Sequence, residues 1–93
     1  MAQTQTFHKT QVYAVQTGDY AGQMFIIVEP NKDTVGCLSI PTMENVKVPF
    51  DAFEHARNND IIKYVEKLPR DVFKVSKAQY FKNENSGNRR EQF

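Results

Sequence analysis

Residues 23–41 read QMFIIVEPNKDTVGCLSIP, and this stretch predicts a β-hairpin at the centre of the fold. Met24 to Val28 is a compact run of apolar, β-branched and aromatic side chains, which favour strands. Pro30 to Asp33 has the composition of a turn, and the second run begins at Thr34 and stops at Pro41. We expect the remaining segments to cover this hairpin.

The flanking segments extend the hairpin into an antiparallel sheet. Residues 11–16 predict a first strand, and residues 17–22 form a loop with glycine at both ends. Residues 46–48 alternate as a short edge strand before Pro49, which lacks a backbone donor. The sheet is therefore expected to begin as a meander.

From Phe50 onward the spacing of apolar residues becomes helical. Phe50, Phe53 and Ala56 fall on one helix face, and Asp60 is expected to cap a second short helix that Pro69 ends. The apolar stripe of that second helix is Ile61, Tyr64, Val65 and Leu68.

Residues 71–81 are open to two interpretations. Val72 to Val75 favours a strand, whereas residues 76–79 would tolerate a helix. We predict a strand that returns to the sheet.

These segments predict a single α+β domain, with a small, partly barrel-like antiparallel sheet of four or five strands and two short helices packed on it. The domain is expected over residues 11–83, between a flexible lead-in (1–10) and a flexible basic tail (84–93). A chain of 93 residues supports only a marginal core, so self-association as a homo-oligomer is expected.

Composition favours a soluble, cytoplasmic protein without membrane contact. Cys37 is the single cysteine, which excludes an intrachain disulfide, and it is expected to be a buried, inert thiol. The N-terminus does not resemble a signal peptide, and no apolar run approaches the roughly 18 residues of a membrane span.

Catalytic motifs are weak in this chain. Asp51, Glu54 and His55 stand at i, i+3 and i+4, so with Asp60 they could serve a metal-dependent nuclease, although a solvated helix face explains the same spacing. The chain also lacks a glycine-rich phosphate loop. We therefore predict no enzymatic activity, no catalytic residue, no metal and no cofactor.

The C-terminal end is the strongest functional candidate. The whole chain has a net charge of +1, yet residues 70–93 carry six basic and three acidic residues. In a strand, Lys74, Tyr80 and Lys82 would share one face, offering cations to phosphates and a ring to unpaired bases, which suits single-stranded RNA. An acidic protein surface would attract the same cations. The candidate RNA-binding or partner-binding residues are Lys74, Lys77, Tyr80, Lys82, Arg89 and Arg90.

Two resemblances bear on function. Residues 15–23, followed by the apolar Phe25 to Val28, resemble the loop of KOW and related SH3-like β-barrel modules, which commonly bind RNA or protein; a plain hairpin loop is the alternative. Residues 22–30, 38–41 and 64–73 together resemble small early accessory proteins of T-even-like bacteriophages.

The second resemblance implies a non-enzymatic protein acting in the host cytoplasm. Such a protein would inhibit a host factor, such as a toxin or a defence nuclease, by binding that factor or its RNA. The alternative is a protein-interaction or structural module that docks a sheet edge or oligomerises without contacting nucleic acid.

Overall fold

The computed structural model describes residues 7–86 and 89–91, with side chains for residues 7–85. The elements follow in the order β1 (Gln11–Val15), β2 (Met24–Pro30), β3 (Thr34–Ile40), β4 (Asn45–Pro49), α1 (Phe50–Asn58), β5 (Ile62–Lys67), α2 (Arg70–Ser86) and β6 (Arg89–Glu91).

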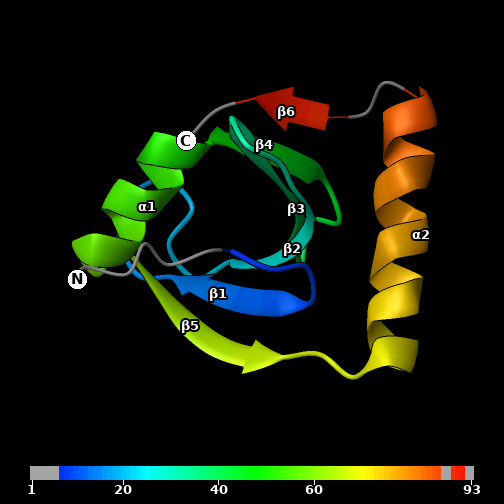
Figure 1. The fold of residues 1–93 in the computed structure, drawn as a ribbon, viewed down its shortest axis with the longest axis horizontal. Helices are drawn as coiled ribbons and strands as arrows, with labels where there is room; N and C mark the ends of the chain where they lie inside the picture. The colour runs from blue at the N-terminus through cyan, green and yellow to red at the C-terminus, as the bar shows by residue number, and fades with distance from the viewer. Residues whose placement is uncertain (1–6, 87–88, 92–93) are drawn as a thin grey trace.

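The strands form one curved sheet in the order β5-β1-β2-β3-β4-β6 (Figure 1). The first five strands in this order pair antiparallel, and the short β6 adds parallel to β4. Among the described residues the sheet does not close, because β5 and β6 lie at its two edges. The predicted α+β class, with a partly barrel-like antiparallel sheet of five strands and two helices, is confirmed.

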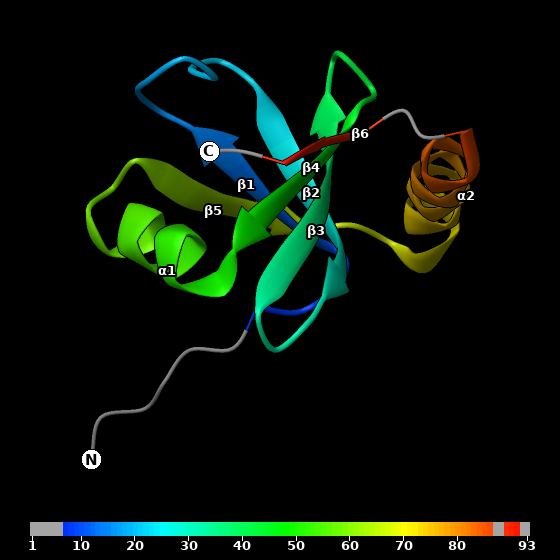
Figure 2. The same ribbon diagram turned by 90° about the horizontal axis from the view of Figure 1, so that it is seen from above.

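The two helices lie on opposite faces of this sheet (Figures 1 and 2). Phe25 and Ile27 of β2 belong to the core on the α1 side, while Ile26 and Val28 belong to the core on the α2 side. Successive side chains of a strand point to opposite faces. The uninterrupted apolar run of β2 thus reflects a strand that is buried on both faces.

Aromatic rings fill the core on the α1 side. The Phe7 ring lies 4.8 Å from that of Phe53, and Tyr13 lies 5.6 Å from Phe53, both edge to face. Phe7 is only 2% exposed, and α2 continues to Ser86. The folded part of the chain therefore extends beyond the expected limits of residues 11–83.

The core on the α2 side combines apolar packing with polar anchors. Phe73 and Tyr80 pack against the sheet, and the Tyr80 hydroxyl donates to Glu29 Oε1 at 3.0 Å. Asn45 Nδ2 in β4 donates to the Tyr80 carbonyl and to Glu84 Oε2, both at 2.8 Å. These directional bonds fix the position of α2 on the sheet.

The prediction of a strand over residues 71–81 is wrong, because this segment lies within α2. The Phe73 N–H donates to the Pro69 carbonyl at 2.9 Å, so Pro69 precedes the first turn of a helix. Val72 and Val75, which favoured a strand, are 49% and 69% exposed. The buried residues recur at i, i+3, i+7 and i+10, the spacing of a helix face, and are Phe73, Ser76, Tyr80 and Asn83.

The prediction of a helix over residues 60–68 is also wrong. Asp60 has a positive φ of 59°, and the Ile61 N–H donates to the Ala56 carbonyl at 2.8 Å, so Asp60 follows the end of α1 and caps no new helix. Residues 62–67 pair antiparallel with β1 as β5. Ile61, Tyr64, Val65 and Leu68 do have helical spacing in the sequence, but pairing with the edge of β1 stabilises a strand instead.

The contact between β3 and α2 can be tested at Gly36. A Cβ placed on Gly36 would lie 2.2 Å from the Tyr80 hydroxyl, which Glu29 holds in place. We expect Gly36→Ala to destabilise the protein by about 1–3 kcal/mol, as overpacked cores do. The cost should shrink in a Tyr80→Phe background, because the clashing oxygen is gone. Urea unfolding of the unsubstituted protein, the two single variants and the double variant measures this coupling, and an equal cost in both backgrounds would contradict the contact.

Candidate functional site

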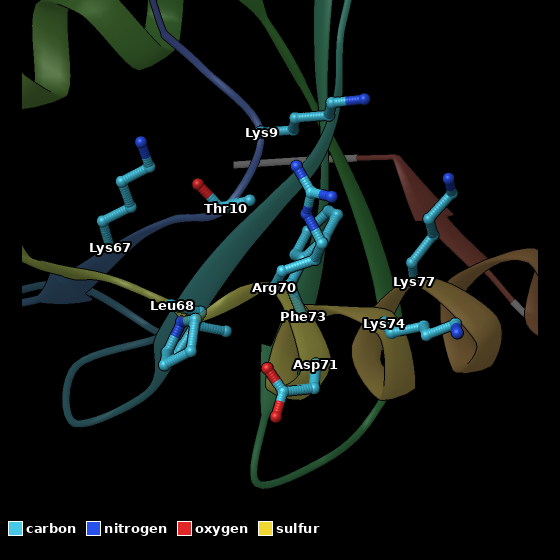
Figure 3. A pocket seen from close by; sticks show the side chains of 10 residues that line it. Lys9, Thr10, Lys67, Leu68, Arg70, Asp71, Phe73, Lys74 and Lys77 are labelled. Atoms are coloured by element: carbon cyan, nitrogen blue, oxygen red, sulfur yellow. The ribbon is translucent and has the colours of Figure 1, made fainter.

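A groove of about 970 Å³ lies where the segment before β1, the end of β5 and the first turns of α2 meet (Figure 3). We call it the basic groove. Its lining residues are Lys9, Thr10, Lys67, Leu68, Pro69, Arg70, Asp71, Phe73, Lys74 and Lys77.

Backbone hydrogen bonds at Thr10 hold one wall of the basic groove. The Thr10 N–H donates to the Ile27 carbonyl at 3.0 Å, and the Thr10 carbonyl accepts from the Leu68 N–H at 2.9 Å. These bonds tie the segment before β1 to both β2 and the β5–α2 connection. They bring Lys9 to the same groove as Lys67, which is distant in the sequence.

Thr10 is also conformationally unusual. Its φ of 82° lies in the left-handed region that residues with a β-branched side chain rarely adopt. Its hydroxyl is buried and has no hydrogen-bond partner among the described residues. Strained backbone and unsatisfied polar groups concentrate at functional sites, so Thr10 marks this wall as a candidate.

Helix α2 supplies the opposite wall. Arg70, Lys74 and Lys77 stand at i, i+4 and i+7, which places them on one side of the helix. Phe73, 6% exposed, faces the core and secures this first part of the helix against the sheet. The three cations therefore project from an anchored helix.

The electrostatic character of the groove is strongly positive. Among the described lining residues, five are basic and Asp71 is the one with a carboxylate. Figure 3 shows Lys67, Arg70 and Lys77 extending to the same side, whereas the Asp71 carboxylate points the opposite way. None of the five cations forms an ion pair with a carboxylate of residues 7–85.

Only part of the predicted binding set meets at this groove. Lys74 and Lys77 line it, whereas Lys82 is exposed on another side of α2. The side chains of Arg89 and Arg90 lie outside the described residues, although their backbone joins β6.

Tyr80 cannot present the stacking ring that the sequence predicted. It is 0% exposed, and its hydroxyl donates to Glu29. Burial, together with this carboxylate, raises the pKa of Tyr80 above its ordinary value. The predicted shared face of Lys74, Tyr80 and Lys82 was wrong, because it assumed the period of a strand.

Sequence reasoning missed Lys9, Lys67 and Arg70. Arg70 carried a usable signal, since a helix beginning after Pro69 puts it in line with Lys74 and Lys77. Lys9 carried none, because its position depends on the long-range hydrogen bonds of its neighbour Thr10.

Asp51, Glu54, His55 and Asp60 were considered in the sequence as an alternative metal site, and they form no such site in the described part of the chain. Within it, no group of three or more histidine, cysteine or acidic side chains is placed to hold an ion. His55 instead contacts its own helix end, with its Nδ1 3.3 Å from Asn59 Nδ2. Asp51 and Glu54 lie on α1, the helix that the sequence predicted for them.

A second cavity, of about 420 Å³, lies between the loop after β1 and α1. Apolar side chains such as Val15 and Ile61 line it, together with Asp19 and His55. None of its described lining residues is a lysine or an arginine, in contrast to the basic groove.

Comparison of the chain with protein-family models, curated proteins and solved structures finds no significant match. Among the described residues, no helix is both long and apolar enough to span a membrane.

The structure makes Cys37 a protected thiol. Cys37 is 0% exposed in β3, and burial raises the pKa of its thiol well above the ordinary value. We expect Ellman's reagent at pH 8 to label the native protein roughly a hundredfold more slowly than the urea-unfolded protein, because labelling requires local opening. Since this is the one cysteine, absorbance reports it directly. Comparable rates in the two states would contradict the burial.

Proposed function

We propose that this protein is a non-enzymatic binding protein that holds RNA in the basic groove. The observation that carries the proposal is the convergence of five cations from three separate segments on one groove, in a chain whose net charge is only +1. Clustered lysine and arginine side chains neutralise phosphates and displace counterions, which supplies most of the affinity in such complexes.

The placement of the groove at the start of α2 adds to this attraction. Pro69, Arg70 and Asp71 border the groove at the N-terminal end of the helix. The positive end of the helix dipole lies there and favours a negatively charged ligand.

The resemblance to early accessory proteins of T-even-like bacteriophages suggests the biological target. On that basis, the RNA would belong to, or accompany, a host factor such as a toxin or a defence nuclease, which the protein would inhibit by binding. An acidic protein surface is the competing ligand for the same cations.

Replacing two groove cations tests the RNA proposal. We expect the double variant Lys74→Gln and Lys77→Gln to bind single-stranded RNA several-fold more weakly. The slope of log affinity against log salt should fall by about one to two, because each lost phosphate contact removes about one counterion. Fluorescence anisotropy across a salt series provides both quantities.

A matched control removes two exposed lysines outside the groove. Lys32 lies between β2 and β3, and Lys82 lies on another side of α2. The variant Lys32→Gln and Lys82→Gln carries the same change in net charge. Equal losses of RNA affinity in the two variants would show that the attraction is diffuse and does not depend on the basic groove. If the unsubstituted protein binds an acidic protein but not RNA, the acidic protein replaces RNA as the proposed ligand.

A second candidate function, self-association, is favoured by the outer edge of β5. Among the described residues β5 pairs only with β1, and Tyr64 and Val65 are 53% and 45% exposed. In an antiparallel pair of two β5 strands centred between these residues, Lys63 would oppose Glu66 of the second copy. The register shift within the β1–β5 pairing leaves Val65 without a partner in β1, and such bulges resist edge pairing. We therefore rank this candidate below the groove.

The edge can be tested with one substitution. If β5 pairs two copies, Val65→Lys should convert a concentration-dependent dimer into a monomer, because it places a charge in the contact. Light scattering after size-exclusion chromatography over a range of concentrations measures the mass. Val72→Lys, at an exposed valine of α2, is the control. A monomeric unsubstituted protein at every concentration would exclude this interface.

A further inference from the structure

The cationic side of α2 continues into an exposed aromatic ring. Arg70, Lys74, Lys77 and Phe81 stand at i, i+4, i+7 and i+11, so they follow one another along the same side of the helix. At a rise of 1.5 Å per residue, Phe81 lies about 6 Å beyond Lys77 along the helix axis. The Phe81 ring therefore follows the cations Arg70, Lys74 and Lys77 along the same side of α2.

The Phe81 ring is braced by a rigid neighbour. Phe81 is 37% exposed, and its ring meets Tyr80 edge to face at 5.2 Å with an interplanar angle of 90°. Tyr80 is itself fully buried and held by hydrogen bonds to Glu29 and Asn45. An aromatic side chain held in this way loses little conformational freedom when a flat ligand stacks on it.

The other large exposed apolar residues in the described part of α2, Val72 and Val75, do not share this position. Val75, 69% exposed, lies about 120° around the helix from Phe81 at 100° per residue. Val72 is 49% exposed and lies about 180° from Phe81. Phe81 is therefore distinguished from these valines by its place on the cationic side.

We propose that Phe81 is a stacking platform for an unpaired base, and that the ligand of the basic groove is accordingly single-stranded. This inference rests on the proposed RNA binding. A strand whose phosphates contact Arg70, Lys74 and Lys77 runs toward Phe81, where a base can turn onto the ring. Bases inside a duplex are stacked on each other and cannot reach it.

The chain contains no tryptophan, so Phe81→Trp introduces a single indole at the platform. We expect a short uridine oligonucleotide to quench its fluorescence, with saturation at the same concentration as the anisotropy change of a labelled oligonucleotide. Val75→Trp is the matched control, since it carries an exposed indole on another side of α2. Its fluorescence should stay unchanged in the saturated complex.

Affinity provides a second, independent measurement. Phe81→Leu keeps an apolar side chain but removes the ring, and it should weaken single-strand binding roughly tenfold. Phe81→Tyr should retain binding, because it preserves the stacking face. Circular dichroism verifies that both variants are folded, and an RNA duplex of equal length should bind the unsubstituted protein more weakly than the single strand.

The outcomes separate this inference from the function on which it rests. Salt-sensitive RNA binding without quenching at position 81, or with equal affinity for single strand and duplex, would overturn the stacking role and leave the groove as an RNA site. Absence of RNA binding by the unsubstituted protein would overturn both.

Discussion

The burial of both faces of the β2–β3 hairpin is the constraint on which the rest of the structure depends. Phe25 and Ile27 require a cover on one side of the sheet, and Ile26 and Leu38 require one on the other. Leaving either set in water would forgo the main favourable term in folding. The chain covers these two faces with α1 and α2, which lie on opposite sides of the sheet.

The basic groove results from the way α2, which covers the second face of the sheet, is connected to β5. Helix α2 reaches its face of the sheet through the short connection after β5, and the Leu68 N–H is bonded there to the Thr10 carbonyl. Phe73 and Tyr80 then fix the helix by packing, while Asn45 and Glu29 fix it by hydrogen bonds. Cations on the helix side are thereby held at a constant position relative to those of the neighbouring segments. A flexible tail with the same charges would have to lose conformational entropy to achieve this arrangement.

The way α2 packs on the sheet also explains why Phe81, and not the adjacent Tyr80, is the exposed aromatic residue. The sequence predicted that the Tyr80 ring faces a ligand, because side chains were assumed to alternate as in a strand. In a helix the two positions are separated by about 100°, and the register set by Phe73 places Tyr80 inside. Phe81 lies on the same side of α2 as Lys74 and Lys77, so an aromatic ring does accompany the cations, but it belongs to Phe81 and not to Tyr80.

The sequence by itself determined the central hairpin, the first four strands, the helix after Pro49 and the α+β class, because these depend on local patterns of apolar residues and turn formers. It also identified Lys74 and Lys77 as candidate binding residues, and both line the basic groove. Tertiary structure alone decided that residues 62–67 pair with β1 as a strand and that residues 70–86 form a helix. Both segments have mixed local preferences, so the partner available in space, an open edge or an uncovered face, selects between them. The convergence of Lys9 with Arg70 was likewise beyond local reasoning, since long-range backbone hydrogen bonds beside Lys9 create it.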